Sequence, residues 1–473
     1  MNNNSKKYKY LFNNIIAFLC GNLGTKLISF FMVPLYTNIL KPSEYGEIDL
    51  ILSIISVISP FVACGIHEGV MRFSLDKDAD TKMVLSIGLR IFMLSSVVFI
   101  LICPLFKFVP IVSQYVEFIY LYIILNEIMT IFLCYIRGMD NIKLYSFLGF
   151  FSGFLTAFLN ILFLVVFKLG LFGYKISILL SPFITTIFAI IIGNLSKDIS
   201  IKKWKKSLAI DMLKYSLILI PNSILWWCIN ASDRFFVSYM CSTADNGIYA
   251  MSYKIPTLLN TVSTIFMQSW QMSAIREYEN KEGSEFCNQI YKLLIFFMGL
   301  ATLILLLINK SVLNIYVGYE YRSAWIYSPF LMISFFAGSL GTFWGSFYIA
   351  SKKMNKYLQS ALFGALVNII LNFLLIKQVG TIGAAIATMV SYIVVLIARA
   401  RGIRKQINLK FINKEILSST VCLIFGIIIS YFSNSWLWIL GLINISLYLI
   451  YNKDQIIILI NFFETLIGNK KGC

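Results

Sequence analysis

Long apolar segments follow one another along almost the whole chain, and they restrict its fold more than any other feature. A helix needs about 20 mostly apolar residues to cross the roughly 30 Å hydrocarbon core of a bilayer. The sequence contains fourteen segments of that kind. We therefore predict an all-α membrane protein with spans at 12–39, 46–70, 83–107, 115–137, 144–167, 171–194, 211–239, 245–272, 286–309, 324–350, 355–376, 380–400, 415–432 and 434–451.

The composition excludes a water-soluble protein of this length. Of the 473 residues, 59% are hydrophobic and 13% are charged, whereas soluble domains contain about 45–50% apolar and about 25% charged residues. So few charges cannot cover a water-facing surface. The nine cysteines are scattered and form no C-x-x-C pair, so the sequence predicts neither a structural disulfide nor a metal site.

The placement of the positive charges predicts the orientation of the chain. A net charge of +18 would suggest nucleic acid binding in a soluble protein. Here about 28 of the 40 Lys and Arg fall in loops on one side of the predicted membrane and about six on the other. Cytoplasmic loops carry such an excess. We expect both termini to be cytoplasmic, the basic N-terminus to lead into a retained first helix, and no nucleic acid partner.

Two basic connectors, 195–209 and 401–414, divide the predicted spans into groups of six, six and two. The predicted organisation is an N-lobe at 1–207 with spans 1–6 and a C-lobe at 208–408 with spans 7–12. Spans 13 and 14 and a cytoplasmic tail then occupy 409–473.

Short glycine motifs recur in the first and second groups of six spans. An acidic residue precedes glycine by two positions in Glu44-Tyr-Gly46 and again in Asp245-Asn-Gly247, 201 residues later (247 − 46). The segments Gly170-Leu-Phe-Gly173 and Gly380-Thr-Ile-Gly383 lie 210 residues apart (380 − 170). Six spans separate each pair, so the halves share one orientation and are related by an axis along the membrane normal.

Charged residues inside apolar spans are the candidates for function, because each costs about 2.5–3.5 kcal/mol to insert. Lys26, Arg234 and Lys254 lie on spans 1, 7 and 8, which begin the two repeats. Apart from Asp233 beside Arg234, they have no obvious partner. Cations of this kind suit an anionic headgroup such as diphosphate, with structural pairing as the alternative. Lys292 is near the inner interface and is expected to snorkel.

The other charged residues of the first half have possible partners of their own. Arg90 on span 3 and Glu127 on span 4 lie at similar depths, which predicts an interhelical ion pair. Glu68 and Arg72 are four residues apart and can pair on one helix face. His67 is the only histidine. It is either a hydrogen-bonded polar residue or part of an ion-coupling or proton site. The same two alternatives, structural pairing or ion coupling, apply to Glu68, Glu127 and Asp233.

Several short motifs together resemble the Wzx-type polysaccharide flippases of the multidrug/oligosaccharidyl-lipid/polysaccharide exporter superfamily. The resemblance runs along the whole chain, and His67 and Glu68 depart from the pattern of that family. The matching segments are Phe31-Met-Val-Pro-Leu-Tyr-Thr-Asn-Ile-Leu40, Lys41-Pro-Ser-Glu-Tyr-Gly46, Gly65-Ile-His-Glu-Gly-Val-Met-Arg72, Ile220-Pro-Asn222, Asp233-Arg234 and Gly247-Ile-Tyr249.

The resemblance implies a MATE-like fold with two six-helix lobes around a cavity lined by spans 1, 2, 7 and 8. It implies a flippase of the bacterial cytoplasmic membrane that works by alternating access and is not an enzyme. The implied substrate is an undecaprenyl-diphosphate-linked oligosaccharide for O-antigen, capsule or a similar polysaccharide. Its diphosphate would meet Lys26, Arg72, Arg90, Arg234 and Lys254.

The implied partners, besides membrane lipids, are a polysaccharide polymerase and glycosyltransferases. The chain has no G-x-x-x-x-G-K-[ST] motif for ATP, and no cofactor is expected. An ion gradient or the membrane potential would therefore drive transport. Two alternatives stay open: a MATE-like antiporter of drugs or cations, which would need acidic residues deep in a lobe, and a membrane-bound polysaccharide polymerase, which would usually need a large outer loop.

Overall fold

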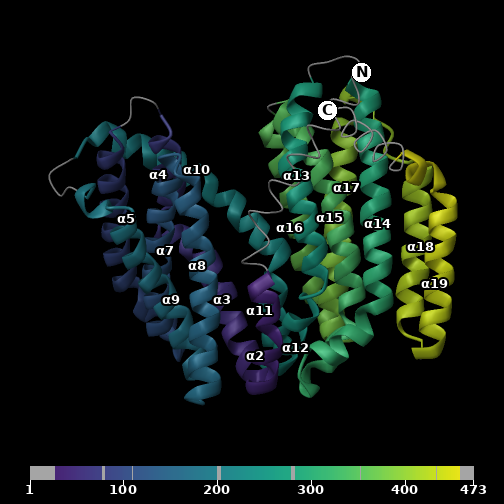
Figure 1. Cartoon of the computed structure of the whole chain (residues 1–473), viewed down its shortest axis with the longest axis horizontal. Helices are drawn as coiled ribbons and strands as arrows, with labels where there is room; N and C mark the ends of the chain where they lie inside the picture. Colours follow the sequence, from purple (N-terminus) through teal and green to yellow (C-terminus); the bar gives the residue numbers. More distant parts are fainter. Residues whose placement is uncertain are drawn as a thin grey trace, which may run out of the picture. The chain divides into compact units, whose positions relative to one another are not determined.

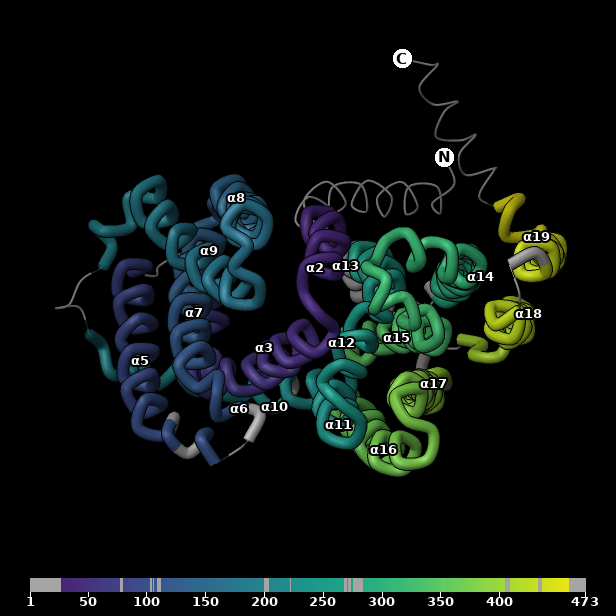
Figure 2. The backbone as a smooth tube through the Cα atoms, turned by 90° about the horizontal axis from the view of Figure 1, so that it is seen from below, coloured from purple at the N-terminus to yellow at the C-terminus, as the bar shows by residue number. Residues whose placement is uncertain are grey.

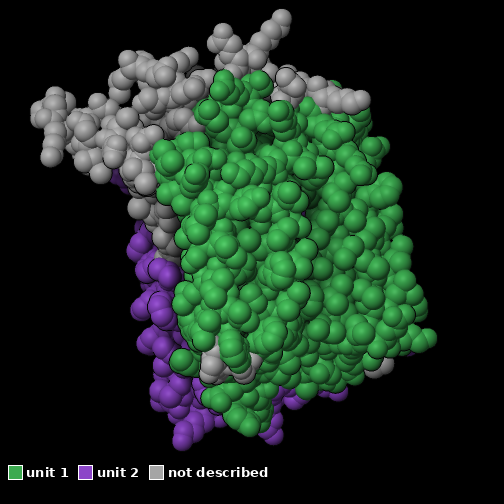
Figure 3. Space-filling model, turned by 90° about the vertical axis from the view of Figure 1, so that its right-hand side faces the viewer, with its two compact units in different colours: residues 1–22, 228–473 green, residues 23–227 purple. Residues whose placement is uncertain are grey.

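The computed structural model describes residues 27–76, 80–108, 110–199, 204–278, 283–351, 353–407, 409–432 and 434–458. These residues form helices joined by short turns, and no strand occurs among them (Figure 1). The all-α class predicted from the sequence is confirmed. The chain divides into two compact units, unit 2 with residues 23–227 and unit 1 with residues 1–22 and 228–473 (Figure 3).

Unit 2 contains the helices of the first half of the chain, and α10 ends three residues beyond its boundary. These helices are α2 (Val33–Ile39), α3 (Pro42–Val62), α4 (Ile66–Ser74), α5 (Thr81–Ile102), η1 (Cys103–Phe108), α6 (Pro110–Ser113), α7 (Val116–Gly138), α8 (Ile142–Asn160), η2 (Ile161–Val166), α9 (Gly170–Ile192), η3 (Leu195–Lys197) and α10 (Lys206–Asn230).

Unit 1 is built around α15, which packs against α13, α14 and α17, as the end-on view in Figure 2 shows. Its helices are α11 (Ser232–Met240), α12 (Thr243–Ser252), α13 (Pro256–Tyr278), α14 (Gly283–Tyr316), η4 (Tyr319–Ile326), α15 (Ser328–Ala350), α16 (Met354–Val379), α17 (Thr381–Ile407), α18 (Lys414–Ser430) and α19 (Asn434–Tyr451).

Within the described residues, ten helices are long and apolar enough to cross a membrane, and Leu27–Ile39 and Trp436–Tyr451 are shorter apolar helices. Large hydrophobic side chains are exposed along many of them, for example Leu101 on α5, Phe363 on α16 and Ile450 on α19. Such a surface is stable in lipid and not in water. The chain is a multi-pass membrane protein.

Three of the predicted spans are interrupted rather than continuous. The span predicted at 46–70 is broken between α3 and α4, where Cys64 and Gly65 have left-handed backbones (φ 51° and 58°). The span predicted at 211–239 is broken at Ala231, and that predicted at 245–272 at residues 253–255, before Pro256. Proline lacks the N–H that would continue a helix. Hydropathy alone does not reveal such breaks, because the residues that form them are themselves largely apolar.

The internal repeat predicted from the sequence is reflected in the helix boundaries. Helices α2 and α11 end at Ile39 and Met240, and helices α3 and α12 begin at Pro42 and Thr243. Both pairs lie 201 residues apart (240 − 39 and 243 − 42). A turn of the same length therefore joins the first two spans of each repeat.

Helix capping explains the acidic residue of the repeated motif. Glu44 accepts a 2.9 Å hydrogen bond from the backbone N–H of Lys41 at the start of α3. At the start of α12, the Ser242 hydroxyl donates to Asp245 (2.6 Å) and accepts from its backbone N–H (3.0 Å). Such contacts satisfy helix N–H groups that have no partner in the first turn. The recurring acid thus has a structural role.

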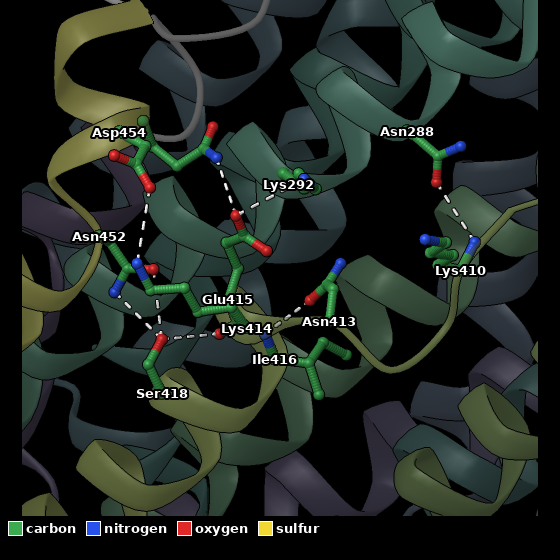
Figure 4. Close-up of polar contacts among 11 residues, drawn as sticks. Asn288, Lys292, Lys410, Asn413, Lys414, Glu415, Ile416, Ser418, Asn452 and Asp454 are labelled. Carbon is green, nitrogen blue, oxygen red and sulfur yellow. Dashed lines mark hydrogen bonds and ion pairs between the residues drawn. The ribbon is translucent and has the colours of Figure 1, made fainter.

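A polar network joins the C-terminal helices α18 and α19 to α14 (Figure 4). Glu415, in the first turn of α18, is 6% exposed and accepts a 2.9 Å hydrogen bond from the Gln455 amide. The Lys292 ammonium lies 4.0 Å from the same carboxylate. Ser418 and Asn452 are hydrogen-bonded to each other in the next layer. Lys292 was expected to snorkel to the interface, and it also faces this carboxylate.

We expect Glu415→Ala to lower the free energy of unfolding by about 1–3 kcal/mol, because it removes the acceptor of a buried hydrogen bond. The measurement is thermal denaturation of the full chain in detergent. Lys414→Ala is the control, since the Lys414–Asp454 pair is solvent-exposed and its atoms are 3.5 Å apart; exposed pairs contribute about 0–1 kcal/mol. Equal stability losses in the two variants would contradict the role of this network.

Candidate functional site

The two helix breaks of unit 1 meet at one buried carboxylate. Asp233 is the second residue of α11, directly after the break at Ala231, and its exposed fraction is 0%. Its Oδ2 accepts hydrogen bonds from the hydroxyls of Tyr249 (2.6 Å) and Tyr253 (2.5 Å). Tyr249 lies on α12 and Tyr253 in the turn before α13. The carboxylate therefore ties one broken helix to the other.

Neutral oxygen-bearing side chains from α16 and α17 surround this carboxylate. The Thr388 hydroxyl lies 3.4 Å from Asp233 Oδ2. Asn368 accepts a hydrogen bond from Ser232 (3.1 Å) and another from Asn372 (2.8 Å), and all of these side chains are buried. A buried carboxylate requires hydrogen-bond donors or a cation to offset its desolvation. The cluster could hold a proton or a small monovalent cation.

Two of the predicted cations lie at the same tyrosine. The Arg234 guanidinium is 5.6 Å from the ring centroid of Tyr253, and Lys254 is the next residue in the same turn. Both cations are half-buried. The aromatic face holds the guanidinium by a cation–π interaction, and Asp233 fixes that ring through its hydroxyl. Sequence reasoning selected Asp233, Arg234 and Lys254 but missed Tyr249 and Tyr253.

The remaining predicted cations of the first half have other surroundings. Arg72 pairs with Asp76 at 2.6 Å, and both side chains are about half exposed (51% and 53%). The predicted Glu68–Arg72 pair is therefore wrong. Both partners are four residues from Arg72, but pairing with the half-buried Glu68 would take the guanidinium out of water, which is costly. Lys26 lies outside the described residues.

Arg90 also lacks its predicted partner. Its guanidinium is 5.7 Å from the Trp204 ring centroid. One and two turns earlier on α5, Ser86 and Lys82 contact Asp198, with Lys82 Nζ 3.0 Å from its carboxylate. This face of α5 holds the segment that follows α9. The expected Arg90–Glu127 ion pair is wrong, because matching depth along two helices does not fix which faces meet.

Glu127 is instead bound at the break between α3 and α4. It is 5% exposed, its Oε1 accepts a hydrogen bond from Ser59 on α3, and its Oε2 lies 3.2 Å from His67 Nδ1 on α4. The Glu68 side chain forms no ion pair or hydrogen bond within the described part of the chain. Across these described residues, no group of three or more His, Cys, Asp or Glu could hold a metal ion.

A family model described as "Polysaccharide biosynthesis protein" matches residues 11–271, more than half of the chain. The chain belongs to this family. This match confirms, at the level of the family, the resemblance seen in the sequence. The matched residues include Asp233, Arg234 and Lys254. No curated protein gives a significant match.

Solved transporter structures share the fold of this polysaccharide biosynthesis protein. The lipid II flippase MurJ in an inward closed conformation aligns with a TM-score of 0.70 and 16% identity over 94% of this chain and 100% of that chain. An inward-facing multidrug resistance MATE family transporter aligns at 0.67 with 14% identity, covering 83% and 94%. The MATE transporter VcmN of Vibrio cholerae, a mutant form, aligns at 0.59 with 14% identity, covering 86% and 99%.

Proposed function

We propose that the protein is a flippase that moves an undecaprenyl-diphosphate-linked oligosaccharide from the inner to the outer leaflet of a bacterial cytoplasmic membrane. It would cross that membrane fourteen times, with both termini in the cytoplasm, and alternate between inward-open and outward-open states. The observation that carries this proposal is the placement of Arg234 on the ring of the buried Tyr253, with Lys254 as the next residue, in a member of a polysaccharide biosynthesis family.

The chemistry of this site suits a diphosphate. Arg presents several N–H donors in a planar fork that matches phosphate oxygens, and Lys adds a compact positive charge. In a membrane-embedded site of low dielectric, two such cations attract an anionic headgroup strongly. Arg234 lies in the first turn of α11, directly after the break at Ala231, and Lys254 lies in the turn at 253–255. A small change in a break would therefore move the cation beside it.

Asp233 is our candidate for ion coupling. Binding of a proton or a monovalent cation at this carboxylate would change its hydrogen bonds to Tyr249 and Tyr253, and so would shift the ring on which Arg234 lies. The membrane potential supplies about 2.3 kcal/mol per charge per 100 mV. This arrangement would link the free energy of an ion gradient to the binding of the headgroup.

Lys26, Arg72 and Arg90 remain proposed headgroup contacts of the first half of the chain. Arg72 would have to release Asp76, and Arg90 would have to leave the Trp204 ring. We also propose the division into 1–207, 208–408 and 409–473, which the repeated helix boundaries 201 residues apart support. Glycosyltransferases would supply the lipid-linked substrate, and a polymerase would consume it.

The proposal is tested by deleting the gene and measuring in which leaflet the lipid-linked oligosaccharide accumulates. We expect accumulation on the inner leaflet and its reversal by the wild-type chain. Reconstitution of the purified chain in vesicles with the lipid-linked substrate gives the direct rate. Normal export in the deletion strain, or transport of cationic drugs instead of the lipid-linked substrate, would refute the proposal.

A further inference from the structure

One buried carboxylate bridges the break between α3 and α4 in unit 2. Ser59 on α3, which precedes the break, donates a hydrogen bond to Glu127 Oε1. His67 on α4, which follows the break, places its Nδ1 3.2 Å from Glu127 Oε2. Glu127 belongs to a third helix, α7. A single side chain thus holds the two parts of the interrupted helix to the same neighbour.

The backbone at this break departs from the regular α-helical pattern, although its N–H groups stay hydrogen-bonded. Cys64 and Gly65 are both left-handed, a conformation that costs energy for a residue with a side chain such as Cys64. Pro60 lies in the last turn of α3 and provides no N–H. A Cβ on Gly65 would lie 3.0 Å from the Ser216 carbonyl oxygen of α10. The angle between α3 and α4 therefore depends on side-chain contacts such as those of Glu127.

Few titratable groups lie near His67 and Glu127, and the nearest is Glu68, the residue that follows His67. The helix α5 presents Ser95 to Cys64, and α10 presents Ser216 to Gly65 and Gly69, none of which carries charge. Both Lys82 and Arg90 of α5 are engaged elsewhere, at Asp198 and Trp204. The other titratable neighbours of the pair are Glu68 on α4, Cys64 in the break, and Tyr122 and Cys134 on α7, with Arg137 near Cys134.

We propose that His67 and Glu127 form a proton-binding latch that keeps the break between α3 and α4 closed. With one proton shared between them, an N–H of the imidazole faces a carboxylate oxygen and the pair is neutral. A second proton, taken from water, bonds to Glu127 Oε2 and leaves the pair with one positive charge. The protonated oxygen no longer attracts the imidazolium, so the polar contact between His67 on α4 and Glu127 on α7 is lost.

Loss of this contact releases α4 from Glu127, while the hydrogen bond from Ser59 continues to hold α3 to the same residue. Binding of one proton thereby changes the angle between α3 and α4. A role of this change in driving transport rests on the proposed function. The latch itself does not, because its opening requires only protons.

Cys64 provides a reporter inside the break. It is half-buried, and its alkylation by N-ethylmaleimide can be followed in the full-length chain after the other cysteines are replaced by serine. A matching chain that retains only Cys228, half-buried on α10, corrects for the effect of pH on thiol chemistry. Neither measurement needs a transport substrate, so the result stands whether or not the proposed function holds.

We expect the corrected labelling rate of Cys64 to rise as the pH falls in the wild-type protein. Glutamine at position 127 resembles the protonated carboxyl group, so Glu127→Gln should label about tenfold faster at neutral pH, the effect of losing one hydrogen bond to a charged group. Its rate should no longer depend on pH. His67→Asn carries no positive charge, and its amide can donate to an ionised Glu127 and accept from a protonated one, so the contact should persist and Cys64 should label slowly at every pH.

Glu117→Gln is the matched control, since Glu117 is an exposed acid on the same helix and should behave as wild type. Labelling of the buried Cys287, retained alone in each variant, reports unfolding. If Glu127→Gln unfolds, His67→Asn decides the question. Wild-type pH dependence in Glu127→Gln, or in His67→Asn, would overturn the latch.

Discussion

Arg234→Ala is expected to abolish transport of the lipid-linked oligosaccharide while leaving the amount of protein in the membrane unchanged. The guanidinium lies on the Tyr253 ring, 5.6 Å from its centroid, and it is half-buried. In the proposed complex Arg234 pairs with the diphosphate, and removing one partner of a buried charge pair costs about 2–5 kcal/mol, which corresponds to a loss in rate of about 30-fold to 5,000-fold. The rate is measured with purified protein in vesicles. Lys254→Ala is expected to act in the same direction.

Arg322→Ala is the control for this experiment. The Arg322 guanidinium also lies on an aromatic ring, 5.2 Å from the centroid of Tyr319, but it is exposed and belongs to η4, which contains neither helix break. It tests whether loss of any cation–π contact in unit 1 impairs transport. Full activity of both Arg234→Ala and Lys254→Ala would remove the headgroup contact from the proposed mechanism.

Substitutions of Asp233 should separate its structural role from ion coupling. Asp233→Ala leaves the hydroxyls of Tyr249 and Tyr253 without their acceptor in a dry core. Hydrogen bonds to charged groups contribute about 1.5–3 kcal/mol each, so we expect a large loss of thermal stability. Asp233→Asn keeps a carbonyl oxygen as acceptor. We expect it to fold, but its transport should no longer respond to an imposed ion gradient.

Both readouts are needed to interpret these variants. Thermal denaturation in detergent reports the structural role, and uptake into vesicles with and without a proton or sodium gradient reports coupling. Asp211→Asn, at an exposed acid on α10, should leave both unchanged. If Asp233→Asn retains a gradient-dependent rate, the carboxylate is a structural tie between two broken helices and the coupling ion binds elsewhere.

The charge pattern predicted which residues matter but not which of them meet. Arg234 and Lys254 were selected because each carries an insertion cost, and the structure places Arg234 on the ring of Tyr253, the residue before Lys254. For Arg72, two acids at equal spacing were available, and the local exposure favoured Asp76. For Arg90, the partner is an aromatic residue more than one hundred positions later in the chain. Contacts of this range depend on helix rotation, which hydropathy does not encode.

Neutral polar residues within the spans carried a signal that could have been used. Asn368 and Asn372 lie one turn apart inside an apolar segment, and both are fully buried. An amide in a membrane needs a hydrogen-bonding partner just as a charge does. Their presence on one face of span 11 indicates that a polar cluster lies opposite. In the structure, Asn368 contacts Ser232 and Thr388, and Thr388 contacts Asp233.

The sequence by itself determined the membrane environment, the all-helical class, the repeat and the family, because these follow from local hydropathy and from short motifs. Tertiary structure decided where the helices break and which carboxylate holds each break, Asp233 for one pair of helices and Glu127 for another. The physical reason is that a buried charge must find its hydrogen-bond partners across helices, and those partners are brought together only by packing.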